Sequence, residues 1–372
     1  MRGLIEKYRE CMPLAADAEA ISLCEGSTPL IRLRNIPKLF DTELDIYVKY
    51  EGLNPTGSFK DRGMTVAVSH AVAQKQKAVI CASTGNTSAS AAAYAARAEM
   101  RCFVLIPEGK IATGKLAQAM IEGAMVIQIK GNFDQGMELV KQIAQQSAVA
   151  VVNSINPYRL QGQKTASLEI IETLGDAPDY HCLPVGNAGN ISAYWMGYSE
   201  AAGQQSFCIE QARSSLGDDY KSASIIATKR PKMLGYQAQG AAPIVTGHKV
   251  DQPETVATAI RIGNPQSWQM ALHASKESEG WLATCSDDEI LAAQSLLADK
   301  EGIFCEPASA ISIAGLMKDI VAKKIKAGSR IVCTLTGHGL KDPDVAIRQS
   351  THRATQTVAP EFNLINDLIN QN

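Results

Sequence analysis

The sequence has no long hydrophobic run, and this absence limits where the protein can work. None of its apolar stretches is long enough to cross a bilayer as a helix, and the first residues lack the apolar core of a secretory signal peptide. The net charge is only −2, so the excess of basic residues that binding to nucleic acid or to an anionic membrane requires is also lacking. We therefore predict a cytoplasmic protein that binds neither nucleic acid nor membrane.

Patterns for disulfide bonds and metal sites are lacking as well. The nine cysteines are odd in number and no two are spaced as C-x-x-C, and the six histidines show no spacing typical of metal ligands. Several cysteines follow apolar residues, as Cys81 and Cys333 do. The sequence predicts reduced cysteines in the protein core, no disulfide framework and no metal site.

What the sequence does contain is an alternation of apolar strand patterns and helical patterns over enough residues for two domains. This alternation predicts the α/β class, with open, mostly parallel sheets covered by helices. We assign residues 55–150 to a smaller α/β domain inserted in the chain, residues 1–54 and 151–345 to a larger one, and residues 346–372 to a C-terminal tail. The polar stretch 203–221 is typical of a surface insertion.

The expected elements follow from apolar spacing and from the Gly, Pro, Asn and Ser residues that bound them. The predicted strands are Leu44–Tyr50, Ala78–Ala82, Arg101–Ile106, Ala124–Ile129, Ala148–Val152, His181–Val185, Ser224–Thr228 and Arg330–Leu335. The predicted helices are Asp61–Ala73, Ser88–Ala98, Gly114–Ile121, Asp134–Gln145, a helix from Ile191, Pro253–Ile260, Pro265–Ala274, Asp287–Lys300, Ala308–Ala322 and Phe362–Ile369.

Lys60 is the candidate catalytic residue, because a turn-forming loop places it at the start of an apolar helical pattern. A lysine amine is nucleophilic only when it is neutral, which requires that burial or a neighbouring cation lower its pKa. Phe59 and Met64 would supply the burial, and Arg62 the cation. The alternative interpretation is a solvated lysine that pairs with Asp61.

Three loops of small and polar residues follow predicted strands, at the edge of a parallel sheet where ligands bind. The loop Gly186–Asn190 offers N–H groups to an anion at the start of a helix, or is an ordinary strand-to-helix turn. The loop Ser83–Ser88 suits a carboxylate, or simply caps the next helix. Asn153, Ser154 and Arg159 form a further candidate anion site, unless Arg159 makes only a surface ion pair. A lysine beside anion-binding loops is what a phosphorylated aldehyde cofactor needs.

From Ser27-Thr28-Pro29-Leu30 to Asp342-Pro343, the chain resembles the threonine synthases, pyridoxal-phosphate enzymes of the tryptophan synthase β (fold type II) superfamily. Single motifs such as the loop Gly186–Asn190 are shared with serine and threonine dehydratases and cysteine synthases, whereas the combination of motifs is specific to the threonine synthases. The motifs that carry the resemblance are Asn54–Met64, Gly162-Gln163-Lys164-Thr165, Ala259–Pro265 and Glu306-Pro307-Ala308-Ser309-Ala310. The resemblance implies the fold type II architecture.

The resemblance also implies a role for each candidate residue. Lys60 would hold pyridoxal 5′-phosphate as a Schiff base, Asn86 would bond the ring hydroxyl and Thr336 would face the pyridine nitrogen. The cofactor phosphate would be held by Gly186, Asn187, Ala188, Gly189 and Asn190. The substrate carboxylate would bind at Ser83, Thr84 and Thr87, and the substrate phosphate at Asn153, Ser154, Arg159 and Asn187.

The implied reaction converts O-phospho-L-homoserine and water to L-threonine and phosphate, by γ-elimination and β-addition, in a homodimer. Two alternatives stay open. A threonine or serine dehydratase-like lyase would have no substrate phosphate to bind, and a non-catalytic pyridoxal-phosphate-binding protein would need no residue for proton transfer.

Overall fold

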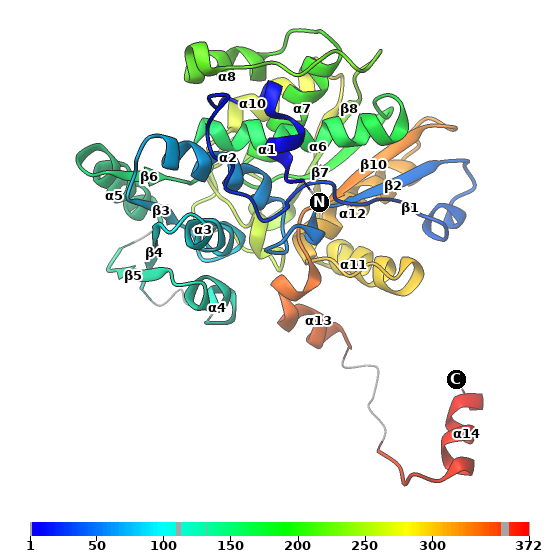
Figure 1. The fold of residues 1–372 in the computed structure, drawn as a ribbon. Helices are drawn as coiled ribbons and strands as arrows, with labels where there is room; N and C mark the ends of the chain where they lie inside the picture. Colours follow the sequence, from blue (N-terminus) through cyan, green and yellow to red (C-terminus); the bar gives the residue numbers. More distant parts are fainter. Residues whose placement is uncertain (1, 109–112, 132, 351–356, 372) are drawn as a thin grey trace.

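Two sheets form the framework of the computed structural model, which describes residues 2–108, 113–131, 133–350 and 357–371 (Figure 1). The large sheet has six strands in the order β1-β2-β10-β7-β8-β9, and only β1 runs antiparallel to its neighbour. Its strands are β1 Leu30–Arg32, β2 Asp45–Tyr50, β7 Tyr180–Pro184, β8 Lys232–Ala238, β9 Trp281–Cys285 and β10 Arg330–Leu335. The predicted α/β class with mostly parallel sheets is confirmed.

The small sheet is entirely parallel and takes its four strands from one stretch of chain, in the order β5-β4-β3-β6. Its strands are β3 Ala78–Ala82, β4 Arg101–Pro107, β5 Met125–Ile129 and β6 Val149–Val151. Figure 1 shows this sheet with α3, α4 and α5 on one side of the molecule and the large sheet on the other. The division of the chain into two domains stays a prediction.

Helices connect the strands, and most of them pack on the sheets. The longer helices are α2 Lys60–Ala73, α3 Asn86–Arg97, α4 Thr113–Ile121, α5 Phe133–Gln146, α6 Pro157–Leu174, α7 Gly189–Ala201, α8 Phe207–Leu216, α10 Trp268–Glu277, α11 Asp287–Glu301, α12 Pro307–Val321, α13 Pro343–Ser350 and α14 Phe362–Gln371. Two short helices, α1 Leu4–Lys7 and α9 Pro243–Thr246, complete the set. Within the described residues, no helix is both long and apolar enough to span a membrane.

Alternate residues of each central strand enter different cores, because successive side chains of a strand point to opposite faces. On β7, Cys182 packs with α11 and α12, whereas Leu183 packs with α6 and α7. On β3, Val79 and Cys81 face α2 and α3, whereas Ile80 faces α5. The central strands of both sheets are therefore covered on two faces, which leaves the strand ends as the place where loops can form a ligand site.

Two expected elements are wrong. Ser224–Thr228 is not a strand, because the N–H groups of Ile226 and Ala227 donate to the Ala201 carbonyl at the end of α7 (2.9 and 3.0 Å). Pro253–Ile260 is not an α-helix, because its backbone bonds to other segments: the Glu254 N–H donates to Gly240 and the Val256 N–H to the Asp287 carboxylate. Only Thr258–Ile260 forms a single 3-10 turn.

The polar stretch 203–221 has more structure than an insertion loop requires. It contains α8, whose Ser206 hydroxyl accepts the Ile209 N–H as an N-cap. The apolar face of α8 is buried against α7 and α10 through Cys208, Ile209, Ala212 and Leu216. The stretch is therefore part of the core on one side and surface on the other.

Candidate active site

Lys60 is the first residue of α2, and the loop before it is held against the end of β10. The Phe59 N–H donates to the Thr336 carbonyl (3.0 Å), and the His338 N–H donates to the Gly57 carbonyl (2.9 Å). Ser58 and Gly337 form an isolated antiparallel bridge between the same two loops. These backbone bonds place Lys60 beside Thr336, at the edge of the large sheet where the strands end.

The Lys60 amine is poised to be neutral. Burial and, to a smaller extent, the Arg159 guanidinium lower its pKa to about 7, against the opposite effect of the Glu306 carboxyl. The Nζ atom lies 4.2 Å from the centroid of the Phe59 ring. A lysine with a pKa near 7 has a substantial neutral fraction at neutral pH, as a nucleophile or proton acceptor needs.

Asp61 is not the partner of Lys60 that the alternative interpretation required. The buried Asp61 carboxylate accepts bonds from the Thr56 N–H (2.7 Å), the Thr56 hydroxyl (2.6 Å) and the Ser90 hydroxyl (2.6 Å). Asp61 thereby fixes the turn before α2 to helix α3.

Arg62 is not the cation beside Lys60, so that expectation is wrong. Arg62 is buried and bonds to Glu51 through Nε (2.6 Å) and to Glu169 through Nη2 (2.7 Å). Lys49 binds the same Glu169 at 2.6 Å. Since two carboxylates already compensate its charge, Arg62 anchors helix α2, and the cation that acts on Lys60 is Arg159.

Arg159 comes close to this region because α6 crosses α2 with almost no space between the two backbones. A Cβ atom on Gly162 would lie 1.8 Å from the Arg62 carbonyl oxygen, so only glycine permits this crossing. The Arg159 side chain is 1% exposed, and its Nη1 donates to the Val152 carbonyl (3.2 Å). Neither a partner for Nε nor a carboxylate for the guanidinium is found among the described residues. Burial lowers the Arg159 pKa to about 10, so the structure buries a cation that lacks an anion.

Asn153 and Ser154 lie at the end of β6, close to the end of β3. The Asn153 amide accepts the Ala82 N–H and donates to the Ala82 carbonyl, both at 3.0 Å. This pairing ties the candidate phosphate residues to the loop that starts at Ser83. Ser154 is partly exposed, as an accessible binding residue would be.

The loop from Ser83 to Thr87 is partly exposed and runs into α3, whose first residue is Asn86. Gly85 is the N-cap of α3, and no side chain of the described residues caps this helix end. The Ser83 hydroxyl accepts the Gly85 N–H (3.2 Å), while Thr84 and Thr87 flank the turn. Since the loop does not cap its own helix, the first N–H groups of α3 remain available to an anion.

The loop Gly186–Asn190 joins β7 to α7 and contains a backbone strain. Ala188 has φ +66°, an uncommon conformation for a residue with a side chain. The Asn187 carbonyl accepts the Ser267 N–H (3.1 Å), which fixes the turn from outside. Both polar atoms of the Asn190 amide are buried without a hydrogen-bond partner in the part of the chain that the structure describes. A buried amide without a partner at the start of a helix is available to contact a ligand.

Thr336 is 5% exposed and bonds to Ser309. Ser309 belongs to the motif Glu306–Ala310, but the sequence alone assigned it no role. The hydroxyl oxygens of Thr336 and Ser309 are 2.9 Å apart, and the Gly337 N–H donates to Ser309 Oγ (2.8 Å). One turn earlier, the Glu306 carboxylate accepts both contacts from the Asn86 amide (3.3 and 3.1 Å). The first turn of α12 thus reaches both Thr336 and Asn86. The sequence signal for this shared role is the spacing of Glu306 and Ser309, which lie three residues apart and therefore on the same side of the helix start.

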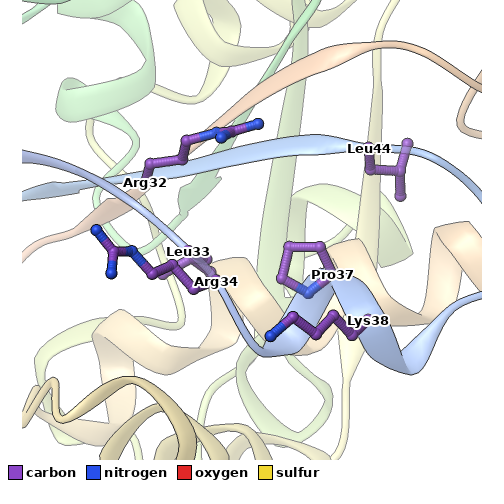
Figure 2. Close-up of a pocket in the computed structure, with 6 residues that line it drawn as sticks. All are labelled: Arg32, Leu33, Arg34, Pro37, Lys38 and Leu44. Carbon is purple, nitrogen blue, oxygen red and sulfur yellow. The ribbon is translucent and has the colours of Figure 1, made fainter.

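A surface depression elsewhere is not part of this site. Figure 2 shows that it is formed by residues from β1 and the segment that leads to β2, none of which belongs to the loops around Lys60. Arg32 there pairs with Asp45 (2.6 Å). The lining residues are Arg32, Leu33, Arg34, Pro37, Lys38 and Leu44.

Comparison with known proteins agrees with the geometry of the loops. The family model described as pyridoxal-phosphate dependent enzyme matches residues 21–337. Curated threonine synthases of Synechocystis (51% identical, covering 98% of this chain and 90% of the relative) and Mycobacterium tuberculosis (55%, covering 93% and 90%) align over nearly the whole chain. The chain belongs to the pyridoxal-phosphate-dependent enzymes, and within them to the threonine synthases. Its cofactor is therefore pyridoxal phosphate, and its substrate is a small molecule.

The same fold is found in a solved structure that is much more distant in sequence. Maize serine racemase superposes with a TM-score of 0.70 at 19% identity, covering 95% of this chain and 98% of the other. This similarity confirms the predicted fold type II architecture and says nothing further about the substrate.

The residues at the site fit a phosphorylated aldehyde cofactor. Lys60 provides a weakly basic amine, and the unpartnered Asn190 amide lies at the start of the long helix α7, where a phosphate binds well. At Gly186, a Cβ atom would lie only 3.0 Å from the Ile260 Cα atom, so the loop is shaped by a close backbone contact. Among the residues that the structure describes, no group of three or more His, Cys, Asp or Glu could hold a metal ion.

Proposed function

We propose that this lyase converts O-phospho-L-homoserine and water to L-threonine and phosphate, with the site residues described above performing the reaction. Family membership supports the activity, and the buried Arg159 supports a phosphorylated substrate. A dehydratase would bury this cation without an anion to neutralise it, and a non-catalytic binder would need no amine with a pKa near 7.

Seven residues would hold the cofactor besides Lys60. Asn86 would bond its ring hydroxyl and Thr336 would face its ring nitrogen, while the phosphate would rest on the N–H groups at the start of α7. We assign this phosphate cradle to Gly186, Asn187, Ala188, Gly189 and Asn190. Because Thr336 carries a hydroxyl and not a carboxylate, it does not force the ring nitrogen to be protonated.

The substrate would be held at its two anionic ends. Its carboxylate would bind the loop of Ser83, Thr84 and Thr87 at the start of α3. Its phosphate would bind Arg159, with Asn153, Ser154 and Asn187 around it. Arg159 donates bidentately to phosphate and is already desolvated, so its bonds to an anion are strong.

Lys60 is the residue that we assign to proton transfer. When bound, the cofactor supplies an electron sink for the charge left at the substrate's α carbon. The neutral Lys60 amine would take the α proton and pass it back to the cofactor-bound substrate, which leaves the amine neutral again. It would then take the β proton, which must leave before phosphate can depart from the γ carbon. Arg159 would hold the departing phosphate. Lys60 would then deliver a proton to the γ carbon and, after water has added its hydroxyl at the β carbon, a proton to the α carbon.

Phosphate release from O-phospho-L-homoserine tests the assignment of Arg159. We expect Arg159→Ala to lower kcat/KM by about 100-fold or more, because a charge-assisted bidentate contact is lost, while bound cofactor still absorbs visible light. Arg97→Ala, at an exposed position at the end of α3, is the matched control and should retain wild-type turnover. Equal turnover of the two variants would remove Arg159 from the substrate site.

We also propose a homodimer. Sedimentation velocity would distinguish it from a monomer of 39.8 kDa.

A further inference from the structure

Glu306 is a buried carboxyl group at the start of α12 that does not serve the helix it begins. It occupies the N-cap position, yet its side chain caps no N–H group among the described residues of α12. The residue is 4% exposed. A buried carboxyl that gives up a cap bond must be compensated elsewhere.

The compensation comes from Asn86. The Asn86 Nδ2 atom donates toward Glu306 Oε1 and Oε2 at 3.3 and 3.1 Å. A carboxylate can only accept, so it fixes which end of the Asn86 amide faces α12. The contact restricts rotation of the Asn86 side chain. Its amide oxygen and second N–H therefore point away from Glu306.

The space for this carboxylate is provided by Gly337, which follows Thr336. A Cβ atom at residue 337 would lie 2.5 Å from Glu306 Oε1 and 2.6 Å from its carboxyl carbon, so any side chain there would displace the carboxylate. The Glu306 N–H donates to the Gly337 carbonyl (3.1 Å), which fixes the start of α12 on the same loop. The loop that contains Thr336 therefore fixes Glu306 on one side, and on its other side Glu306 binds Asn86.

The charged groups around Glu306 come from two segments, the start of α2 and the segment after β10. Burial raises the pKa of Glu306, with Asp342 acting in the same direction, whereas the hydrogen bond from Asn86 and the charges of Lys341 and Lys60 favour the ionised carboxylate. In return, Glu306 raises the pKa of Lys60 against the effects of burial and Arg159. The carboxylate thus acts on both the residue that would anchor the cofactor and the residue that would orient its ring.

We infer that Glu306 is a positioning residue for the cofactor: it locks Asn86 toward the ring hydroxyl and supplies the negative charge that the Lys60 amine faces. The inference rests on the proposed function, because it takes Lys60 and Asn86 as cofactor-binding residues. Glu306 itself touches neither substrate nor reacting atoms in this assignment.

Two substitutions separate the charge of Glu306 from its position. Glu306→Gln keeps the shape and an acceptor oxygen but removes the charge, so we expect the pKa of Lys60 in the cofactor-free protein to fall by about one pH unit. This pKa is read from the ¹³Cε lysine resonance that is missing in Lys60→Arg. Glu306→Ala also frees Asn86, and we expect the dissociation constant for pyridoxal 5′-phosphate to rise roughly tenfold.

The controls decide between this inference and a purely structural role. Glu210→Ala, at an exposed position on α8, should leave both readouts unchanged. Gly337→Ala retains the charge but displaces the carboxylate, and it should weaken cofactor binding as Glu306→Ala does, which keeps the test valid if the latter does not fold. In an Asn86→Ala background, removing Glu306 should weaken binding no further.

A Lys60 pKa unchanged in Glu306→Gln, or cofactor affinity unchanged in Glu306→Ala and Gly337→Ala, would overturn the inference. Failure of the wild-type protein to bind pyridoxal 5′-phosphate would overturn the proposed function instead, and the two failures are therefore distinguishable.

Discussion

Two buried arginines come from the crossing helices, Arg62 from α2 and Arg159 from α6, and their charges are compensated to opposite extents. Arg62 is enclosed by Glu51 and Glu169; although burial alone would lower its pKa, these two carboxylates raise it. Arg159, equally buried, has its pKa lowered to about 10 by burial.

The difference separates a cation that anchors the fold from one that we propose binds an anion of the substrate. A fully compensated buried charge fixes one conformation and has no capacity left for a ligand. A buried charge without a counter-ion lowers the stability of the folded protein until an anion binds to it. Such destabilising groups are typical of binding sites. The three predictions below test this contrast.

The largest effect is expected when Arg62 is removed. Arg62→Met should lower the free energy of unfolding by about 3–5 kcal/mol, because it leaves Glu51 and Glu169 buried with only Lys49 nearby. Urea unfolding of the cofactor-free protein measures the change.

The control for Arg62 is Lys229→Met, which breaks a half-exposed ion pair with Asp179 and should change stability by about 1 kcal/mol or less. If both variants lost the same small amount, the Arg62 cluster would not be the anchor of α2.

The reverse is expected at Arg159. Arg159→Met should leave the free energy of unfolding within about 1 kcal/mol of the wild type or raise it, because it removes an uncompensated buried charge. The same urea titration applies. A loss as large as that of Arg62→Met would mean that Arg159 has a structural partner in the folded protein.

The smallest effect concerns Lys60 and pH. Its folded pKa of about 7 lies below the ordinary value of 10.5, so between these values the unfolded chain binds more protons than the folded one. The contribution of Lys60 to stability therefore increases as the pH rises from about 7 to about 10.5. Unfolding midpoints of cofactor-free protein at pH 7 and 9.5 should rise more in the wild type than in Lys60→Met, and parallel shifts would contradict the lowered pKa.

The sequence predicts the small sheet well, since each of its strands is a short apolar run bounded by turn residues. Ala78–Ala82 is found at its predicted bounds, and the others differ by one residue or so. The large sheet is less predictable because β8 has Gly235 at its centre, which weakens the strand pattern, and because β9 is short and partly exposed. β8 and β9 form because β8 pairs with β7 and β9 pairs with β8, and their local sequence propensity is weak.

The candidate site shows the same division between local and tertiary information. Lys60 and the loop at 186–190 are visible in the sequence because turn chemistry marks them. The partners are not visible: the sequence places Arg62 beside Lys60, yet the helix crossing at Gly162 brings in Arg159 from nearly 100 residues later. Glu306 lies further still along the chain, and only the fold brings it to Asn86.

The backbone contact at Gly162 also sets a length scale for the reaction. Because two helix backbones touch there, the separation between the Cα atoms of Lys60 and Arg159 is set by main-chain geometry. In the proposed assignment, this separation and the lengths of the two side chains together select the distance between the reacting centre of an amino acid and its terminal phosphate. Adapting the enzyme to a shorter phosphorylated amino acid would then call for a change in the helix crossing or in the length of these side chains.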